Sequence, residues 1–418
     1  MHDVIVIGAG FTGLSAAREL TRAGKDMLVL EARDRVGGRV ESRTNGLGER
    51  IDTGGEFLCQ DMPELMALVR EFGMPLIEPH FSGEDVAQPN MTAAEFAETY
   101  RGSQALRERL DAIDIDDSAA TSRTVAEWAA GQPESASAKA AFRSLVQGLW
   151  CHPMEDIPVW HLADNDRRIT NETFELQYHV GGTLHAVADR LAGTLGDRLR
   201  LSHPVVAIEV RDGAARVMTE SGEAFTARNI IVALPPNAAA KIGYRPALPD
   251  PLRKALAVWR SGSVIKALLR YERPFWRDQG RSGSVLWRDP AGLYACDTGT
   301  DDRPALTVFA GGPLALEWRE KGEAGIRAEI VDRLIAALGE KAGSPLDVHI
   351  RDWSFDRWCG GGYSDLIIDM GARNAEDIIR AGAPPIHFAC SEISPSFPGY
   401  VEGAIVAGRL AARRLGGT

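Results

Sequence analysis

Short apolar runs and glycine-rich turns alternate at the start of the chain. Residues 3–7 (Asp-Val-Ile-Val-Ile) are typical of a strand buried on both faces of a parallel sheet. After a glycine-rich turn, apolar residues recur on one side of the segment 14–20, which predicts a helix ending near Gly24. A second apolar run, 27–30, leads to Glu31. The first thirty or so residues therefore predict a complete βαβ unit.

The same strand patterns return in the middle and at the end of the chain. We expect a helix, a turn and two strands over 179–210, a hairpin over 216–220 and 224–227, buried strands over 229–236 and 386–390, and a terminal helix over 403–415. A chain of 418 residues is also too long for one simple core. We predict an α/β protein with two domains. Residues 1–75, 180–249 and 382–418 form a Rossmann-like domain, interwoven with a mixed-sheet and helical domain of residues 76–179 and 250–381.

Composition argues against several classes of function. Hydrophobic residues make up 44% and charged residues 25% of the chain, as in an ordinary soluble globular protein. The net charge of −11 predicts no binding to nucleic acid or to an anionic membrane. No stretch approaches the roughly 20 apolar residues of a membrane span, and the first strand leaves no room for a signal peptide. The five cysteines form no CxxC pair, so we expect free thiols and a cytoplasmic location.

The first turn has the spacing of a dinucleotide-binding loop. Gly8-Ala-Gly10-Phe-Thr12-Gly13 lets the backbone turn tightly and approach a pyrophosphate at the start of a helix. Glu31, which Ala32 follows, ends the next strand and is placed to bind the ribose hydroxyls. Because strand, turn, helix and acid occur in the right order, we predict that the chain binds a dinucleotide.

One lysine interrupts an otherwise apolar strand. Lys266 shares a face of the strand 263–269 with Val264 and Leu268. A buried ammonium without a partner costs several kcal/mol, so Lys266 requires a partner or a route to solvent. The sequence contains no HExxH, GxSxG or clustered histidines, which argues against a metal site and against a serine nucleophile.

Several motifs together resemble those of the flavin-dependent amine oxidases, monoamine oxidase in particular. They are VIVIGAGFTG (4–13), the run 31–39, IDTGGEF (51–57), SGSVIKALLRYERPFWR (261–277), WSFDRWCGGGYS (353–364) and HFACSEISPSFPGYVEGAIVAG (387–408). The run SFPGYVEGA (396–404) also resembles the sequence of bacterial 6-hydroxynicotine oxidase. The resemblance covers nearly the whole chain and is weak between about 76 and 145.

This resemblance implies FAD as the cofactor of the first domain and a substrate site in the second. It implies that Gly38 and Arg39 pass beside the pyrophosphate and that Val205 contacts adenine. Glu392 would lie beside the ribityl chain, and the helix that begins at Val401 would point at the pyrimidine end of the flavin. The segment that would run under the flavin contains Gly55, Glu56 and Phe57.

The resemblance also implies a reaction centre. Tyr363 and Tyr400 would face each other across a neutral amine in front of the flavin, and Lys266 would act through water near flavin N(5). The products would be an imine and, with dioxygen as acceptor, hydrogen peroxide. Monoamine oxidases attach FAD to a cysteine where this chain has Gly362, and Cys359 should not reach the same flavin carbon. We therefore expect non-covalent FAD.

Other functions stay open at this point. An L-amino-acid oxidase needs an arginine facing the substrate carboxylate, and Arg101, Arg143 and Arg168 are candidates. An FAD-dependent desaturase or dehydrogenase would share the fold without the pair of tyrosines. A protein that binds FAD without turnover is the least favoured alternative, because Lys266 and both tyrosine positions are present. The sequence also leaves open a homodimer.

Overall fold

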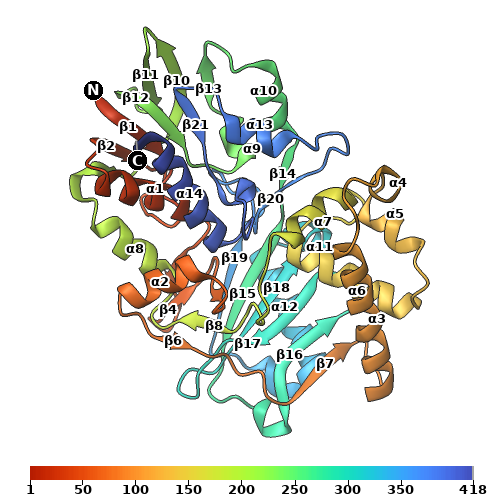
Figure 1. Cartoon of the computed structure of the whole chain (residues 1–418). Helices are drawn as coiled ribbons and strands as arrows, with labels where there is room; N and C mark the ends of the chain where they lie inside the picture. Colours follow the sequence, from red (N-terminus) through yellow and green to blue (C-terminus); the bar gives the residue numbers. More distant parts are fainter. Residues whose placement is uncertain (417–418) are drawn as a thin grey trace.

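The computed structural model describes residues 1–416 and contains two large sheets (Figure 1). The first sheet has eight strands in the order β13-β10-β11-β12-β1-β2-β9, and β21 pairs with β12 as well. Their bounds are β1 His2–Ile7, β2 Met27–Leu30, β9 Leu199–Arg200, β10 Val205–Arg211, β11 Ala214–Thr219, β12 Ala224–Val232, β13 Gly243–Arg245 and β21 Ile386–Phe388.

Strand β1 lies inside this sheet and is buried on both faces. It runs parallel to β12 on one side and to β2 on the other, with Val6 opposite Ile231 and Val29. Val6 packs into one core cluster, whereas its neighbours Ile5 and Ile7 pack into another. Helices α1 (Phe11–Arg22), α8 (His185–Gly193) and α14 (Val401–Gly416) contribute to the first cluster, and α9 (Pro236–Ala239), α10 (Asp250–Ala257) and α13 (Ala375–Ala381) to the second. The predicted βαβ unit and the α/β fold class are confirmed.

One strand prediction was wrong. The segments 224–227 and 229–236 were expected as two strands, but they form the single strand β12, which ends at Val232. The first part of β12 pairs with β11, and its last three residues pair with β21 in parallel. The polar residues Arg228 and Asn229, which lie between the two predicted strands, do not interrupt β12. The pairing passes from β11 to β21 along the strand, so one continuous strand serves both neighbours.

The second sheet is mixed and has six strands in the order β19-β15-β18-β17-β16-β7. Only the pair β16 and β7 is parallel. Helices α11 (Pro313–Arg319) and α12 (Gly322–Leu338) bury apolar side chains against it. The bounds are β7 Glu84–Gln88, β15 Val264–Arg270, β16 Arg281–Trp287, β17 Leu293–Asp297, β18 Ala305–Gly311 and β19 Asp347–Asp352.

A layer of helices lies beside the second sheet in Figure 1 and has a core of its own. It consists of α3 (Ala93–Asp111), α4 (Ser118–Thr121), α5 (Val125–Ala130), α6 (Ala136–Trp150) and α7 (Val159–Arg167). The remaining elements are α2 Pro63–Glu71, the pair β3 Ser42–Thr44 and β4 Arg50–Asp52, the three strands β5 Phe57–Leu58, β6 Leu76–Ile77 and β8 Tyr178–Val180, and the pair β14 Trp259–Ser261 and β20 Asp365–Ile367. We keep the division into the two interwoven domains as a proposal. None of the helices within residues 1–416 is long and apolar enough to cross a bilayer.

Helix α14 packs along α1, although the two lie at opposite ends of the sequence (Figure 1). At their contact a Cβ built on Gly408 would lie 2.1 Å from the carbonyl oxygen of Thr12. A backbone atom moves aside far less readily than the end of a flexible side chain. This position therefore requires glycine, and the contact holds α1 in place behind the glycine-rich turn.

We predict that Gly408→Ala destabilises the protein by about 1–3 kcal/mol or more, because the added methyl group has no space between the two helices. The matched control is Gly193→Ala in α8, where a Cβ would meet no atom within 4 Å. That change should be neutral or stabilising by up to about 1 kcal/mol. Thermal melts compare the two variants, and equal melting temperatures would show that α14 can shift away from α1.

Candidate active site

The turn between β1 and α1 fits a dinucleotide phosphate. Gly10 is the N-cap of α1, no side chain caps the helix, and its first turn contains no acidic residue. A Cβ on Gly13 would lie 1.9 Å from the carbonyl oxygen of Gly8, so α1 starts directly against the end of β1. Gly38 approaches Gly10 so closely that its Cβ would lie 3.3 Å from the Gly10 Cα. The uncapped N–H groups and the partial positive charge of α1 suit an anion.

Glu31 is fixed beside this turn by the backbone. Its carboxylate accepts hydrogen bonds from Ala9 N at 2.7 Å and from Arg33 N at 2.8 Å. Burial raises the pKa of Glu31, although these two N–H groups oppose the rise. His203 N donates to the Glu31 carbonyl oxygen at 2.7 Å, which brings the start of β10, with Val205, to the same edge. Ala32, which is predicted to bind the cofactor together with Glu31 and Val205, directly follows Glu31 and is half-buried.

Arg39 joins three distant parts of the chain. Its Nη1 donates to Glu392 Oε1 at 2.5 Å and to the Tyr363 carbonyl oxygen at 2.9 Å, and its Nη2 donates to Ser391 Oγ at 3.1 Å. Burial opposes the charge on the Glu392 carboxyl, but Arg39 outweighs it and holds the pKa of Glu392 below its usual value. Burial and the Glu392 charge raise the pKa of the neighbouring Asp365 to about 6. The role of Arg39 beside a pyrophosphate stays a prediction.

Lys266 has the partner that its buried position requires. Only 2% of its surface is exposed, and its Nζ donates to Glu56 Oε2 at 2.7 Å and to the Gly54 carbonyl oxygen at 2.9 Å. Gly55, between the two acceptors, is exposed, and its N–H donates to the Arg39 carbonyl oxygen at 3.2 Å. The turn before β5 thus binds Lys266 through Gly54 and Glu56 and binds Arg39 through Gly55.

Two further titratable groups lie around this pair. Asp52 is buried, and its Oδ2 accepts a hydrogen bond from Leu184 N at 2.9 Å. Burial and the charge of Glu56 raise the pKa of Asp52 to about 8, although Lys266 opposes the rise. His179 Nδ1 lies 3.9 Å from Glu56 Oε1, and burial lowers the pKa of His179. At neutral pH Asp52 is therefore mostly protonated and His179 is uncharged.

Phe309 is the centre of an aromatic group around Lys266. Its ring lies 5.7 Å from Lys266 Nζ and contacts the rings of Tyr363 at 6.3 Å, Phe57 at 6.5 Å and Tyr294 at 6.5 Å. Tyr363 is 38% exposed, yet burial raises the pKa of its hydroxyl well above the usual value. The Tyr363 ring is thus accessible although its hydroxyl is desolvated.

The second predicted tyrosine, Tyr400, is hydrogen-bonded to an acidic side chain. The hydroxyl of Tyr400 donates to Glu175 Oε2 at 2.6 Å. Burial and the charges of Glu175 and Asp166 raise the pKa of Tyr400 well above its usual value, and Arg107 opposes them. Tyr400 is half-buried, so it combines access with desolvation as Tyr363 does.

The chain segments that hold the two tyrosines touch each other. A Cβ on Gly399, which precedes Tyr400, would lie 3.2 Å from the Cβ of Ser364, which follows Tyr363. Val401 is the first residue of α14 and is half-buried. The structure therefore brings Lys266, Phe57 and Tyr363 into one aromatic group and places the segment of Tyr400 against it.

Cys359, near the expected flavin attachment position, is not available as a nucleophile. It is buried, and its Sγ contacts Asp356 Oδ1 at 3.3 Å and the Gly361 carbonyl oxygen at 3.3 Å. Burial and the charge of Asp356 raise the pKa of the Cys359 thiol to about 12. With Gly362 beside Tyr363, this arrangement fits FAD held without a covalent bond.

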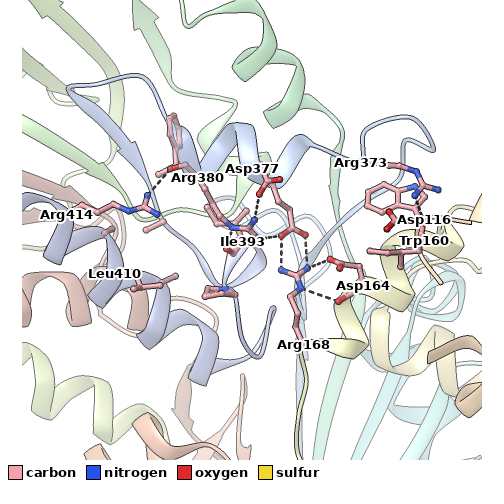
Figure 2. Close-up of a pocket in the computed structure, with 17 residues that line it drawn as sticks. Asp116, Trp160, Asp164, Arg168, Arg373, Asp377, Arg380, Ile393, Leu410 and Arg414 are labelled. Carbon is pink, nitrogen blue, oxygen red and sulfur yellow. Dashed lines mark hydrogen bonds and ion pairs between the residues drawn. The ribbon is translucent and has the colours of Figure 1, made fainter. Parts of the chain in front are cut away.

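The three arginines considered for a substrate carboxylate lie elsewhere. Arg101 is exposed on α3, and Arg143 pairs with Glu155 at 2.7 Å on the surface. Arg168 lines a crevice of about 580 Å³ between α7, α13 and α14 (Figure 2). There it binds both carboxylate oxygens of Glu376 at 2.8 Å. The Arg168 guanidinium is thus already paired with the carboxylate of Glu376, and this pair links the end of α7 to α13.

Lys266, Tyr363 and Tyr400 do not line this crevice, although several residues of the motif 387–408 do. Its arginines already have protein partners: Arg373 donates to Ile115, Arg380 to Asp377 and Arg414 to the carbonyl oxygen of Arg380. In Figure 2 the dashed lines join Arg168, Arg380 and Arg414 to neighbouring residues of the crevice, and Arg373 lies beside Trp160. The aromatic group, rather than this crevice, is therefore the candidate active site.

Reasoning from the sequence missed three residues of the site. Phe309 lies in an apolar strand where nothing distinguishes it from a core residue, and Glu175 lies in a loop without a motif. Arg107 is one of three arginines along α3, and no motif distinguishes it from the other two. Among residues 1–416, no group of three or more His, Cys, Asp or Glu residues is arranged to hold a metal ion.

Comparison with known proteins extends over nearly the whole chain. The family model of the flavin containing amine oxidoreductases matches residues 11–416. An L-amino acid dehydrogenase from Synechocystis sp. is 27% identical and covers 99% of this chain and 94% of its own. Putrescine oxidase from Kocuria rosea is 29% identical over 99% and 95% of the two chains.

Solved structures resemble the whole fold. A putrescine oxidase structure with bound putrescine has a TM-score of 0.89 at 26% identity and covers 99% of this chain and 98% of its own. Cyclohexylamine oxidase from Brevibacterium oxydans has the same TM-score and the same two coverages at 28% identity.

Proposed function

Because the chain belongs to the flavin containing amine oxidoreductase family, we propose that it oxidises the C–N bond of an amine to an imine, with dioxygen as the electron acceptor. FAD is the cofactor. The observation that carries the proposal is the grouping of Lys266, Phe309 and Tyr363, with the segment of Tyr400 against it. Hydrolysis of the imine would then give an aldehyde or ketone.

Bound FAD would supply the oxidant, taking a hydride equivalent from the carbon beside the amine nitrogen and passing two electrons to dioxygen to form hydrogen peroxide. Tyr363 and Tyr400 orient the substrate between their rings, and their desolvated surroundings favour the neutral amine. Both phenol pKa values are raised, so neither ring becomes a phenolate near neutral pH. Lys266 acts near flavin N(5).

One observation favours a second candidate substrate class, the L-amino acids. Arg107 lies 5.8 Å from the centroid of the Trp150 ring and is an electrostatic neighbour of Tyr400. The carboxyls of Asp111 and Asp166 are further electrostatic neighbours of Arg107. A guanidinium near the substrate tyrosine suits a carboxylate. The L-amino acid dehydrogenase relative agrees with this alternative.

The proposal includes a cytoplasmic setting. The cysteines at 59, 151, 296, 359 and 390 are all buried and free, as in proteins of reducing compartments. A homodimer stays a prediction that light scattering would test.

We predict that Tyr363→Ala and Tyr400→Ala each slow anaerobic flavin reduction by an amine by roughly 10²-fold while FAD stays bound, because one ring orients the amine poorly. The double variant should lose much less than the product of the two single effects. Stopped-flow absorbance at saturating amine gives the rates.

Tyr271→Ala is the matched control for these variants. Tyr271 is 2% exposed and its hydroxyl donates to the Ala342 carbonyl oxygen, so it is a core tyrosine. This change should cost about 3–5 kcal/mol of stability and leave the rate per folded molecule unchanged. If Tyr363→Ala and Tyr400→Ala behave like this control, the two tyrosines are core residues and do not orient substrate.

We predict that flavin reduction accelerates as pH rises through the pKa of the bound amine, since only the neutral amine has a free lone pair. The apparent pKa should differ between two amines of different basicity. Asp52, whose pKa is about 8, would instead give one fixed value for every amine. Rates from pH 6 to 10 with two amines, repeated in Asp52→Asn, distinguish the two origins. A value that is the same for both amines would contradict the neutral-amine requirement.

A further inference from the structure

The ion pair between Lys266 and Glu56 is enclosed by the protein. Lys266 is 2% and Glu56 9% exposed, and the Nζ–Oε2 distance is 2.7 Å. Lys266 projects from β15, in the second sheet, and Glu56 lies 210 residues earlier, beside the turn before β5. The ammonium that the proposed function puts near the flavin is therefore paired with an acid of this chain.

We infer that Glu56 is a positioning residue that sets the net charge which Lys266 presents to the flavin, and thereby the rate at which dioxygen reoxidises the reduced cofactor. This inference rests on the proposed function, which puts Lys266 near flavin N(5). Glu56 acts through Lys266, because its carboxylate is hydrogen-bonded to the ammonium itself.

The charges around the pair leave it electrically balanced. Asp52 carries a proton at neutral pH, because its pKa is raised to about 8 by burial and by Glu56. His179 is neutral because burial lowers its pKa, and burial likewise raises the pKa of the Cys296 thiol. One ammonium and one carboxylate then sum to zero. If Glu56 were neutral, the cluster would carry a positive charge unless Asp52 ionised in its place.

A net positive charge at this position should mainly affect the transfer of the first electron to dioxygen. Bound FAD, once reduced, would supply dioxygen with two electrons in turn and one proton, and solvent would supply the second proton of hydrogen peroxide. Negative charge develops on dioxygen in the first transfer. A desolvated cation stabilises that charge more strongly than an ion pair does, because the carboxylate offsets the field of the ammonium.

The experiment is a double-mutant cycle with the FAD-loaded enzyme. Glu56→Gln keeps an oxygen acceptor for Lys266 and removes the charge, and Glu56→Gln combined with Asp52→Asn prevents Asp52 from replacing it. Each protein is reduced anaerobically with dithionite, so that no amine substrate is needed, and is then mixed with dioxygen in a stopped-flow instrument at pH 7. Glu56→Gln and Asp52→Asn are also introduced into Lys266→Met. The combination of Lys266→Met with Glu56→Gln removes both members of the buried pair together.

At pH 7 the inference predicts that Glu56→Gln with Asp52→Asn reoxidises about tenfold faster than Asp52→Asn alone. Lys266→Met should reoxidise more slowly than the unaltered protein. Adding Glu56→Gln to it should change the rate less than twofold, because a buried carboxyl that has lost its cation takes up a proton and carries no charge to remove. Equal effects of Glu56→Gln with and without Lys266, or no acceleration, would overturn the inference.

Sulfite binding gives a second readout that does not depend on turnover. Sulfite adds to flavin N(5) and the adduct is anionic, so its Kd should fall about tenfold when Glu56→Gln is introduced into Asp52→Asn, and should not change when Lys266 is methionine. An unchanged Kd in both backgrounds would show that Glu56 is only a structural partner. If no amine reduces the flavin, the proposed function fails, whereas this cycle still tests Glu56.

Discussion

A half-buried guanidinium, paired with a buried carboxylate, connects the parts of the chain on which the site depends. Arg39 follows the glycine-rich region at the start of the sequence, yet it binds Glu392 near the end and the carbonyl oxygen of Tyr363. Breaking a buried ion pair by removing one member typically costs about 3–5 kcal/mol, because the other charge is left unpaired. The position of Tyr363 is therefore coupled to the loop that is expected to pass the pyrophosphate.

The same arrangement explains how a reaction centre can be both polar and dry. Lys266 and Glu56 satisfy each other, and Tyr400 donates to Glu175, so the charged groups have partners at the edge of the aromatic surfaces. The faces of Phe309, Tyr294 and Tyr363 can then surround an apolar substrate portion without leaving a buried charge unpaired. An amine that enters as a cation would lose its proton readily in such surroundings.

The sequence predicted what depends on local pattern and missed what depends on distant pairing. The βαβ unit follows from apolar periodicity and glycine spacing, and β1, α1 and β2 are where they were expected. The sequence also indicated that Lys266 needs a partner. It did not identify Glu56, because that contact joins residues 210 positions apart through a turn whose path only the fold determines. Glu175 lies in a loop without a motif, and Arg168 was considered for substrate although its partner, Glu376, is 208 residues away.

The central claim is that an amine delivers its electrons to FAD in the site around Tyr363 and Lys266. The most direct measurement is an anaerobic titration of the FAD-loaded protein with a monoamine, a diamine and several L-amino acids, following flavin absorbance and the carbonyl product. The account predicts that at least one amine bleaches the flavin with one carbonyl product per flavin reduced. Bleaching by L-amino acids alone, or by none of these compounds, would contradict it.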